Sequence, residues 1–468
     1  MESSPQSGEE SNINVIDNEL SDKIQHMMAE SGDTVNQDLE NKVKNTSFQT
    51  SDTVVDHDNM KIDNGINSNN DCDENECEIC LTDLPSEVLI HIASFLDSRT
   101  IIQSLYQVCK IFHDLFNHDR YWKTRMSQRW KKIQPVFERE DFNWRKTCME
   151  REEVHQAWSN PDEYFHHFMI RDGFFSAVDV VHLMKGGQYL AVGSRDRYLN
   201  IFDLDKYDCD SERPTTNLNI FSETKVHKGW IWSMASYDNT LVTGSWDTYV
   251  RLWDLGNDDI THQDIKLETP VLGIYYERNF IAACGFNKRM YMIDPRTPRD
   301  YTRKCYHQKP VLCITGDSKH VLTGGEDGVV SVYDRTAGKQ FKQFQIDSFV
   351  NSISYGNDQL WLGDKKGRLH VVDTHHNLFD ENTIQTYDVG HTGRVYGLIH
   401  ADGAIYTGSS DTMVKVIEPI LDPDVITTLK PHKGEVARIS YNNGVFATAG
   451  SDISVGVWLP KKQNYDIF

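Results

Sequence analysis

Four sets of histidine, threonine and aspartate recur along this 468-residue chain with one spacing. In each set the histidine precedes the aspartate by 20 residues and the threonine precedes it by four. An imidazole beside a carboxylate and a hydroxyl could form a hydrolase triad. One active site needs a single copy, so the recurrence instead predicts buried hydrogen-bond networks that stabilise a repeated unit. The sets are His227, Thr243 and Asp247; His307, Thr323 and Asp327; His391, Thr407 and Asp411; and His432, Thr448 and Asp452.

The turns that contain these aspartates belong to a longer repeat of seven segments. Each segment has a small or polar four-residue turn and then an alternating apolar strand. The fourth turn residues stand at 196, 247, 287, 327, 366, 411 and 452, where Asn287 and Lys366 replace the aspartate. Seven residues after each of them stand Asp203, Asp254, Asp294, Asp334, Asp373, Glu418 and Leu459. A period of roughly 40–45 residues with a strand ending in Trp-Asp is typical of four-stranded propeller blades.

Residues 164–468 therefore resemble the WD-repeat family. The resemblance implies an all-β, seven-bladed propeller. It also implies that an aromatic residue completes the polar sets to buried tetrads, a role that falls on Trp253, Tyr333 and Trp458.

A propeller ring also needs a strand that closes its last blade and removes the sheet edge there. The aromatic segment 164–170 has strand-like composition and no other evident use. Residues 464–468 are the alternative, but Pro460 and the two lysines after it weaken the tail as a strand. We therefore expect residues 164–170 to close the ring.

The WD-repeat resemblance also implies a binding surface at one end of the propeller, the mouth. It is built from the loops that carry the tetrad histidines and from the turns that carry the aspartates. Aromatic and arginine side chains there would suit protein recognition, because Trp, Tyr and Arg dominate interface hot spots. The alternative is that some of these side chains are buried between blades, and Trp232 is the first candidate for this. The predicted substrate-binding residues are Arg195, Trp230, Trp232, Trp246, Phe286, Phe349, Lys365, Arg394 and Tyr396.

Residues 81–127 have a helical pattern instead, with apolar residues at a 3.6-residue period and Ser98 as a candidate N-cap. The run Leu84-Pro85-Ser86-Glu87-Val88-Leu89, the Phe95-Leu96-Asp97 break and the late Trp122 resemble an F-box. An F-box implies docking to the adaptor of SCF (Skp–cullin–F-box) ubiquitin ligases, and through it to a cullin. The alternative is that the apolar residues form only an internal core, although so short a module often needs a partner to cover its apolar face. The predicted adaptor-binding residues are Leu84, Pro85, Val88, Leu89, Ile92 and Leu96.

Two further segments complete the expected organisation of a multidomain chain. Residues 1–75 hold 17 acidic side chains against four lysines and a single aromatic residue, which predicts a disordered acidic tail. Residues 128–163 are expected to form a helical linker, with a helix over 142–158 capped by Asp141.

Composition excludes several classes of protein. The formal net charge of −22 makes nucleic acid an unlikely partner, and no apolar run approaches the length of a membrane span. Nine scattered cysteines and no secretory signal indicate a cytoplasmic or nuclear protein with reduced thiols. No cofactor and no metal are expected, because Cys72, Cys77 and Cys80 supply only three of the four ligands that structural zinc requires.

An F-box before a seven-bladed WD propeller resembles the F-box/WD-repeat substrate receptors. Phe142-Asn143-Trp144 and the elongated first repeat resemble the F-box/WD-repeat protein 9 group among them. The resemblance implies a non-catalytic subunit that presents a protein substrate for ubiquitination. The alternatives are a propeller scaffold outside any ligase and an RNA-binding propeller that stacks bases on its aromatic mouth.

Overall fold

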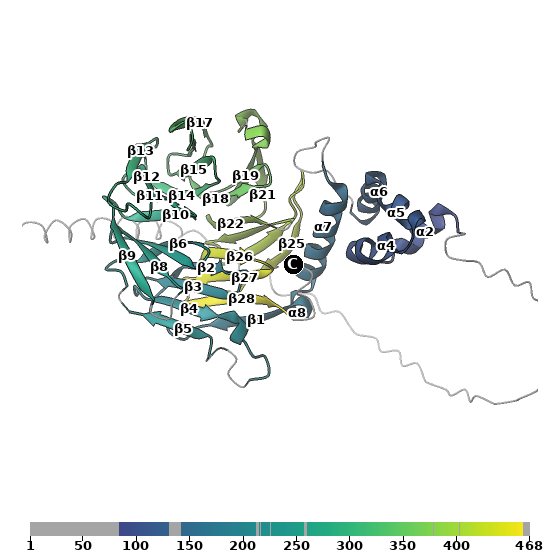
Figure 1. Ribbon diagram of the computed structural model, residues 1–468, viewed down its shortest axis with the longest axis horizontal. Helices are drawn as coiled ribbons and strands as arrows, with labels where there is room; N and C mark the ends of the chain where they lie inside the picture. The colour runs from purple at the N-terminus through teal and green to yellow at the C-terminus, as the bar shows by residue number, and fades with distance from the viewer. Residues whose placement is uncertain are drawn as a thin grey trace, which may run out of the picture. The chain divides into compact units, whose positions relative to one another are not determined.

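The computed structural model describes residues 84–130 and 142–461, apart from 212–214, 216, 225, 257–259, 378 and 402 (Figure 1). The described residues belong to one compact unit. The predicted acidic tail, the candidate zinc ligands Cys72, Cys77 and Cys80, the proposed cap Asp141 and the alternative closing segment 464–468 lie outside the described residues.

The N-terminal described residues form a small helical module, as their apolar period predicts. Asp97, and not the expected Ser98, caps its second helix, because its carboxylate accepts a hydrogen bond from the backbone N–H of Thr100 at 2.7 Å. Leu89, Ile101, Phe112, Phe116 and Trp122 are buried in its core. Its elements are α2 (Ser86–Ala93), α3 (Ser98–Thr100), the π-helical turn Ile101–Leu105, α4 (Tyr106–Val108), α5 (Lys110–Phe116) and α6 (Asp119–Arg129).

Helix α7 (Trp144–Ser159) and the short α8 (Pro161–Tyr164) lead from this module to the first strand. Asn143 caps α7 by accepting a hydrogen bond from the backbone N–H of Lys146 at 2.9 Å. Trp158 at the other end of α7 is fully buried among Phe165, Tyr406 and Phe446. This helix therefore packs directly on the β-structure.

The rest of the chain forms seven four-stranded antiparallel sheets, which confirms the predicted seven-bladed propeller. Blade 1 contains β2 (Val178–Met184), β3 (Tyr189–Ser194), β4 (Leu199–Asp203) and β5 (Asn219–Glu223). Blade 2 contains β6 (Ile231–Tyr237), β7 (Thr240–Ser245), β8 (Tyr249–Asp254) and β9 (Thr261–Lys266). Blade 3 contains β10 (Val271–Glu277), β11 (Phe280–Gly285), β12 (Arg289–Ile293) and β13 (Thr302–Cys305). Blades 4 and 5 contain β14 (Val311–Gly316), β15 (His320–Gly325), β16 (Val329–Asp334) and β17 (Lys339–Gln345); β18 (Val350–Gly356), β19 (Gln359–Asp364), β20 (Arg368–Asp373) and β21 (Gln385–Asp388). Blades 6 and 7 contain β22 (Val395–Ala401), β23 (Ala404–Ser409), β24 (Val414–Ile417) and β25 (Val425–Leu429); β26 (Val436–Asn442), β27 (Val445–Gly450) and β28 (Ser454–Pro460).

Strand β1 (Phe165–Ile170) supplies the outer strand of blade 7, which confirms the predicted closure. It pairs antiparallel with β28, with Phe165 opposite Pro460 and Ile170 opposite Val455. Tyr164, the first residue of the expected segment, ends α8 instead. The innermost strands contact each other around the ring, including β26 with β2, so the ring is closed.

Seven positions after the turn, five blades have an aspartate, while blade 6 has Glu418 and blade 7 has Leu459. The structure explains both departures from the repeat. In five blades an aspartate there accepts a hydrogen bond from a backbone N–H two residues later, and so shapes the turn toward the outer strand. In blade 6 the residue is Glu418, which reaches Arg151 of α7 at 2.5 Å. In blade 7 it is Leu459, which instead pairs with His166 of β1. The departures therefore mark the blades that contact α7 and close the ring.

Candidate functional site: a propeller mouth and an apolar helical surface

The four polar sets come together in space as the spacing predicts. In blade 2, His227 Nδ1 lies 3.0 Å from a carboxylate oxygen of Asp247, and Nε2 lies 2.9 Å from Thr243 Oγ1. Trp253 Nε1 donates to the same threonine oxygen at 3.0 Å, which completes a tetrad. Equivalent contacts of 2.8–3.1 Å join the other three sets, in blades 4, 6 and 7.

These partners fix the chemistry of each histidine. A carboxylate only accepts hydrogen bonds, so Nδ1 of His227 carries the proton and Nε2 accepts from the threonine hydroxyl. Burial lowers the pKa of His227 and of His432, which favours the neutral ring. Burial also opposes ionisation of Asp247, but hydrogen bonds from His227 and from backbone N–H groups outweigh it and lower the pKa of that carboxyl. Because both ring nitrogens are occupied and His227 is buried, the tetrad stabilises its blade and offers no free base to a substrate.

The aromatic member of the tetrad varies between blades. Of the described residues, only Trp253 donates its N–H to the threonine of its set. Tyr333 is buried beside Tyr306 in blade 4, and Trp458 stacks on His167 of β1 at a ring separation of 4.4 Å. The indole of blade 7 therefore serves ring closure.

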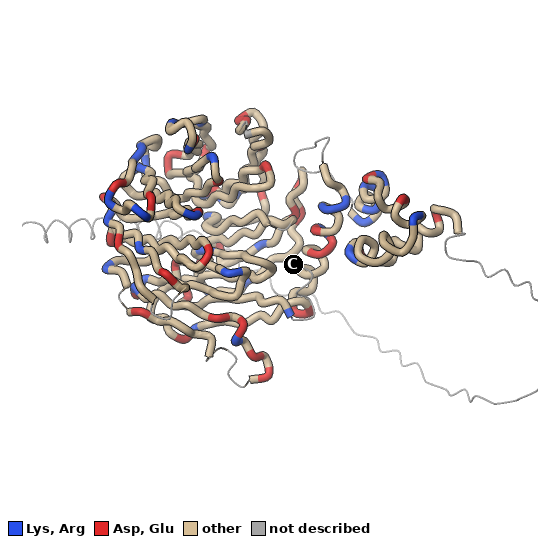
Figure 2. Tube along the Cα trace, in the orientation of Figure 1, with Lys and Arg blue, Asp and Glu red and all other residues tan. Residues whose placement is uncertain are grey.

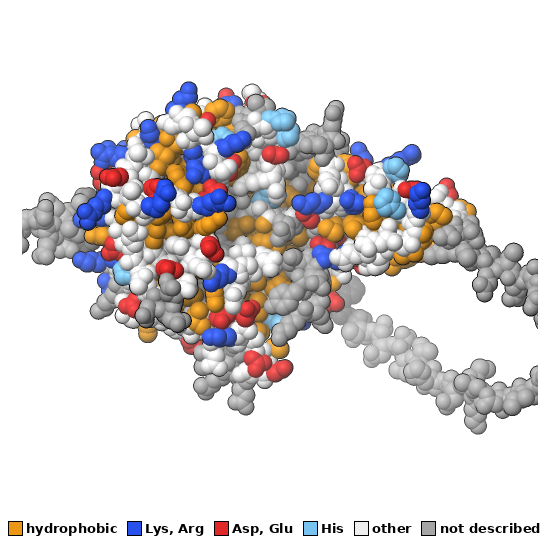
Figure 3. All heavy atoms as spheres, viewed as in Figure 1, with side chains coloured by type: hydrophobic (Ala, Val, Ile, Leu, Met, Phe, Trp, Pro, Cys, Tyr) orange, Lys and Arg blue, Asp and Glu red, His pale blue; other side chains and the backbone are white. Residues whose placement is uncertain are grey.

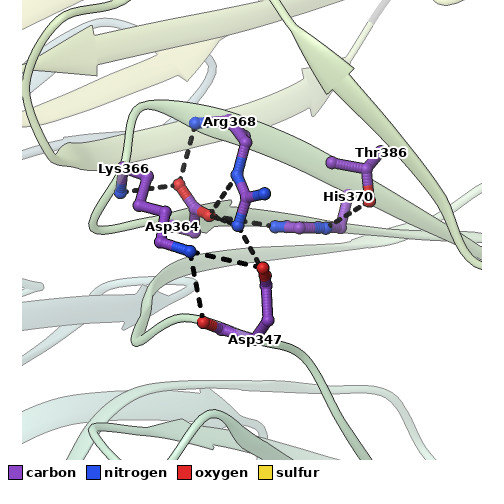
Figure 4. A network of polar contacts seen from close by, with 6 residues as sticks. All are labelled: Asp347, Asp364, Lys366, Arg368, His370 and Thr386. Atoms are coloured by element: carbon purple, nitrogen blue, oxygen red, sulfur yellow. Dashed lines mark hydrogen bonds and ion pairs between the residues drawn. The ribbon is translucent and has the colours of Figure 1, made fainter.

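Blade 5 lacks the tetrad and builds a related network from other positions (Figure 4). Asp364 is fully buried and faces His370 Nε2 at 3.2 Å, while His370 Nδ1 lies 2.9 Å from Thr386 Oγ1. An acid, an imidazole and a threonine hydroxyl are thus combined again, although Lys366 occupies the turn position of the aspartate.

Basic side chains occupy the outer part of this blade 5 network. Arg368 donates to Asp364 at 2.8 Å and to Asp347 at 2.5 Å, and Lys366 donates to Asp347 at 3.3 Å (Figure 4). Asp347, Asp364 and His370 are residue types that could hold a metal ion. Their carboxylates already accept these cationic donors, so we assign the cluster to the structure of the blade.

One backbone hydrogen bond recurs seven times and defines the mouth. In every blade, the N–H of the residue before the turn position donates to a carbonyl of the facing loop at 2.9–3.2 Å. The predicted residues Arg195, Trp246, Phe286 and Lys365 are donors in this set, and Trp230, Phe349 and Arg394 are acceptors. The structure therefore places these seven residues at equivalent positions around one rim.

The other two predicted mouth residues, Trp232 and Tyr396, lie on a second ring of positions. Each innermost strand has a register shift near its start, so that one residue is left out of the pairing. Such β-bulges re-aim a side chain out of the sheet. The residues at the shifts are Asp179, Trp232, Leu272, Leu312, Asn351, Tyr396 and Ala437.

Four of the six predicted aromatic residues of the mouth gather on blades 2 and 3. Trp246 contacts Trp230, Trp232 and Phe286, with ring centroids 5.7–6.3 Å apart. The guanidinium of Arg195 lies 4.8 Å from the centroid of the Trp230 ring. All nine predicted residues are half-buried, Trp232 included. The rim thus presents aromatic surface beside a cation.

Sequence reasoning missed the acidic residues of the mouth. Asp179 pairs with Arg195 at 3.0 Å, and burial raises the pKa of this carboxyl. Burial likewise raises the pKa of Glu326 and of Glu435, which lie near lysine and arginine side chains of the mouth. The repeat places Glu326 directly before Asp327 and Glu435 three residues after His432, so the spacing could have found both. Blade 1 has no tetrad histidine, so only the turn at Arg195 could have pointed to Asp179.

The helical module divides its predicted adaptor-binding residues between core and surface. Leu89 is 3% exposed within the core, and Leu84 and Leu96 are half-buried. Pro85, Val88 and Ile92 are exposed. Leu89 therefore supports the module from inside and contributes no open surface in this conformation.

Three further apolar residues of the module, which were not among the predicted adaptor-binding residues, are exposed. Phe95 is 78% exposed, Val108 68% and Ile111 48%. Val88, Ile92 and Phe95 follow at i, i+4 and i+7, so they lie on one face of α2 and the turn after it. Figure 3 shows hydrophobic side chains at the surface of this helical module. We refer to Val88, Ile92, Phe95, Val108 and Ile111 as the apolar strip.

A WD-repeat propeller preceded by an F-box-type helical module is the class of protein that this fold and these surfaces define. A family model described as F-box-like matches residues 81–128, and one described as WD domain, G-beta repeat matches residues 219–254 and 301–334. The chain belongs to the F-box/WD repeat-containing proteins.

The relatives support the resemblance to one group within this family. F-box/WD repeat-containing protein 9 from Bos taurus and from Homo sapiens are each 32% identical to the chain over 379 residues, or 81% of the chain and 82% of the relative. F-box/WD repeat-containing protein mec-15 from Caenorhabditis elegans is 25% identical over 335 residues, or 68% of the chain and 80% of the relative. The similarity to the protein 9 group inferred from Phe142-Asn143-Trp144 is thereby confirmed.

Among the residues that the structure describes, none of the helices has both the length and the apolar character of a membrane span.

Proposed function

We propose that this protein is a substrate receptor of an SCF ubiquitin ligase. The apolar strip binds the adaptor, and through it the cullin, while the propeller mouth binds the protein to be ubiquitinated. The chain itself does no chemistry in this scheme and needs no cofactor. It raises the effective concentration of the substrate beside a ubiquitin-charged enzyme.

The exposure of the apolar strip is the observation that carries the adaptor assignment. The core of the module is already filled by Leu89, Phe112 and Trp122, all at most 4% exposed. Because other side chains occupy the core of the module, the residues of the apolar strip stay exposed to solvent. An apolar face of this kind on an α-helix fits a hydrophobic groove on a partner. Exposed apolar surface on a small soluble module marks an interaction site.

In the described part of the chain, α7 contacts blade 6 at the end opposite the mouth. In blade 6, the turn that ends at Asp411 lies at the mouth, and β24 runs from there to Glu418 at the opposite end of the blade. Arg151 of α7 binds Glu418 at that opposite end. A substrate on the aromatic rim would therefore not compete with α7 for the same surface.

Adaptor co-purification from cells tests the first half of the proposal. Ile92→Asp in the full chain removes apolar surface from the strip without touching the core, so we expect adaptor recovery to fall by at least about tenfold. Val425→Asp is the matched control, because Val425 is an exposed apolar residue on a propeller strand at nearly the same exposure. Unchanged recovery with Ile92→Asp and Phe95→Asp would contradict the proposal and favour a scaffold outside the ligase.

Proximity labelling under proteasome inhibition tests the second half. The double variant Trp230→Ala/Trp246→Ala removes the centre of the aromatic rim, and proteins that accumulate beside the wild type should disappear from its labelled set. Adaptor recovery should stay at the wild-type level. Loss of the adaptor together with the labelled proteins would mean that the variant unfolds, and Phe286→Ala, which removes one rim ring, then repeats the test.

A further inference from the structure

Arg438 is a half-buried cation with few hydrogen-bond partners at the centre of the propeller. It stands on the innermost strand of blade 7, directly after the bulge at Ala437. Its Nη1 donates to the backbone carbonyl of Tyr396 at 2.8 Å and, at 3.5 Å, to that of Ala437. A guanidinium has five N–H donors, so most of its capacity is unused. Within the described part of the chain, no carboxylate lies within 4 Å of it, unlike Arg125 and Arg151, which each have an acidic partner.

Arg438 lines a central cavity of about 130 Å³ just below the mouth. The bulge residues Leu272, Leu312, Asn351 and Tyr396 line the same cavity, so it is continuous with the second ring of the mouth. Asn351 is only 6% exposed, and its Oδ1 has no hydrogen-bond partner among the described residues. A turn of this amide by 180° would present its N–H₂ group at the same place. The cavity thus holds a fixed positive charge and an unpaired amide.

The charges around the cavity limit what it can accept. Burial lowers the pKa of Arg438, but a guanidinium stays protonated in proteins. Asp179 attracts Arg438 electrostatically, but its carboxylate is hydrogen-bonded to Arg195, and Glu435 lies close to both Arg195 and Arg394. Arg438 therefore has no carboxylate within ion-pair distance in the described part of the chain, which suits a single negative charge. A phosphate dianion favours clustered arginines, and these are neutralised here.

We propose that this cavity binds one carboxylate of the protein substrate, an aspartate or glutamate side chain or a C-terminal carboxylate, through a charge-assisted hydrogen bond from Arg438. The inference rests on the proposed substrate-binding role of the mouth and specifies what that mouth selects. The planar guanidinium matches the two oxygens of a carboxylate. The aromatic rim of blades 2 and 3 would hold the flanking residues of an extended segment.

Acetate tests the cavity without any substrate. A ligand that binds only the folded state raises its stability. The full-length chain should melt at a higher temperature in sodium acetate than in sodium chloride of the same ionic strength, and Arg438→Met should abolish that difference. Arg438→Met replaces a half-buried charge that has no carboxylate partner with an apolar chain of similar length, so it should fold and melt at about the same temperature as the wild type in chloride. Arg296→Met, an exposed arginine of blade 3, is the charge-matched control.

Peptides test the cavity as part of a substrate site. We would screen the full chain against extended degenerate peptides that carry one fixed central Glu, Gln or phosphoserine, and against free and amidated C-termini. The wild type should retain Glu or free-acid peptides at least about tenfold better than Gln or amidated ones. In Arg438→Met this ratio should fall to about twofold or less, while Arg296→Met keeps it.

The outcomes separate this inference from the proposed function. The wild type could retain Glu and Gln peptides equally, and Trp230→Ala/Trp246→Ala could abolish that retention. This result would overturn the carboxylate site and leave the mouth as the substrate surface. Preference for phosphoserine over Glu would also overturn it. Acetate stabilisation lost in Arg438→Met, together with no peptide retention at all, would support the cavity as a carboxylate site and count against the mouth. Equal melting of the wild type in acetate and chloride would overturn the inference whatever the peptides do.

Discussion

Helix α7 is held by the propeller and by the F-box helices in different ways. On the propeller side, the Trp158 ring contacts Phe165, Tyr406, Phe446 and Trp458 within 6.3 Å, and these residues share one apolar cluster. On the F-box side the contact is led by charge, since Arg125 and Glu152 form a buried ion pair at 2.8 Å, with each side chain 5% exposed. Figure 2 shows acidic and basic residues gathered along α7.

This difference has a physical consequence. Apolar packing gains free energy in proportion to buried area and tolerates small shifts. A buried ion pair must recover its desolvation cost and does so only in one geometry. Glu152 also accepts from the backbone N–H of Ser98, and Arg125 also donates to the carbonyl of Ala93. We infer that the propeller side stabilises α7 and that the F-box side orients it.

The largest effect is expected on the propeller side. Trp158→Ala should lower the free energy of unfolding by about 3–5 kcal/mol, because it leaves a large cavity among aromatic rings. Chemical denaturation of the full chain measures this loss. Trp230→Ala, at the half-buried rim, should cost clearly less. If both variants lost the same free energy of unfolding, the packing of Trp158 would stabilise the protein no more than an aromatic residue at the rim does.

The second effect concerns the ion pair. Burial opposes both charges, but the pair raises the pKa of Arg125 and lowers that of Glu152, so both remain charged. Arg125→Met should therefore destabilise the helical module by about 3 kcal/mol, because Glu152 loses its main counter-charge. Hydrogen exchange should quicken in α2 and α6 more than in the blades.

Two further variants sharpen the ion-pair prediction. The double variant Arg125→Met/Glu152→Leu should recover most of the lost stability, since no buried charge of the pair remains and Arg129, the other cation on Glu152, is 51% exposed and can be solvated. Lys146→Met, which breaks an exposed pair with Glu150, should cost less than about 0.5 kcal/mol. A double variant as unstable as the single one would mean that the pair itself supplies stability rather than orientation.

A smaller effect separates the tetrad from the blade 5 network. Thr243→Val in blade 2 leaves both His227 and Trp253 without their shared partner, at a cost of about 2 kcal/mol. Thr386→Val in blade 5 removes one partly buried contact to His370, and water can reach the exposed Thr386 side, so the cost should be about 0.5 kcal/mol. Urea denaturation of the two variants gives the ratio. A larger loss from Thr386→Val would show that blade 5 depends on its network more than blade 2 does.

The smallest effect is a pH dependence of the propeller. Burial lowers the pKa of His182 and of His400 from 6.5 to about 4. The unfolded chain therefore binds more protons between about pH 6.5 and 4, so this stability is complete above pH 6.5 and is lost as the pH falls through that window. Each histidine should contribute on the order of 1 kcal/mol after allowance for solvent screening.

Denaturation midpoints at pH 7 and pH 5 measure this loss. His182→Gln keeps a partner for Ser236, which lies 2.8 Å from His182 Nε2, and should reduce the difference between the two midpoints. The histidines of the F-box helices, His91, His113 and His118, are exposed. Hydrogen exchange at pH 5 should therefore quicken in the blades before it quickens in α2, and the reverse order would contradict the assignment to the half-buried propeller histidines His182 and His400.

Much of the propeller was predictable because its contacts are local in the repeat. The His, Thr and Asp of a tetrad lie within one blade, so a constant spacing reveals them. The residue seven positions after the turn also differs in the two blades with special contacts. It is Glu418 in blade 6, which binds α7, and Leu459 in blade 7, which pairs with β1. The helical module was less predictable. Asp97 and Ser98 are both good caps, and the sequence could not say which would cap α3.

The sequence by itself determined the number of blades and their His, Thr and Asp sets, since both depend on short spacings that hydrogen bonds and strand period impose. It also indicated the strand that closes the ring, through the strand-like composition of residues 164–170, although that strand pairs with residues 455–460. Only the tertiary structure decided which side of α2 faces the core, because the apolar period marks Leu89 and Ile92 alike. It also decided that Arg438 has no carboxylate within ion-pair distance among the described residues, while Glu435 of blade 7 lies near Arg195 of blade 1 and Arg394 of blade 6. Blades 1 and 7 are far apart in the chain, and only the closed ring fixes the distance between them.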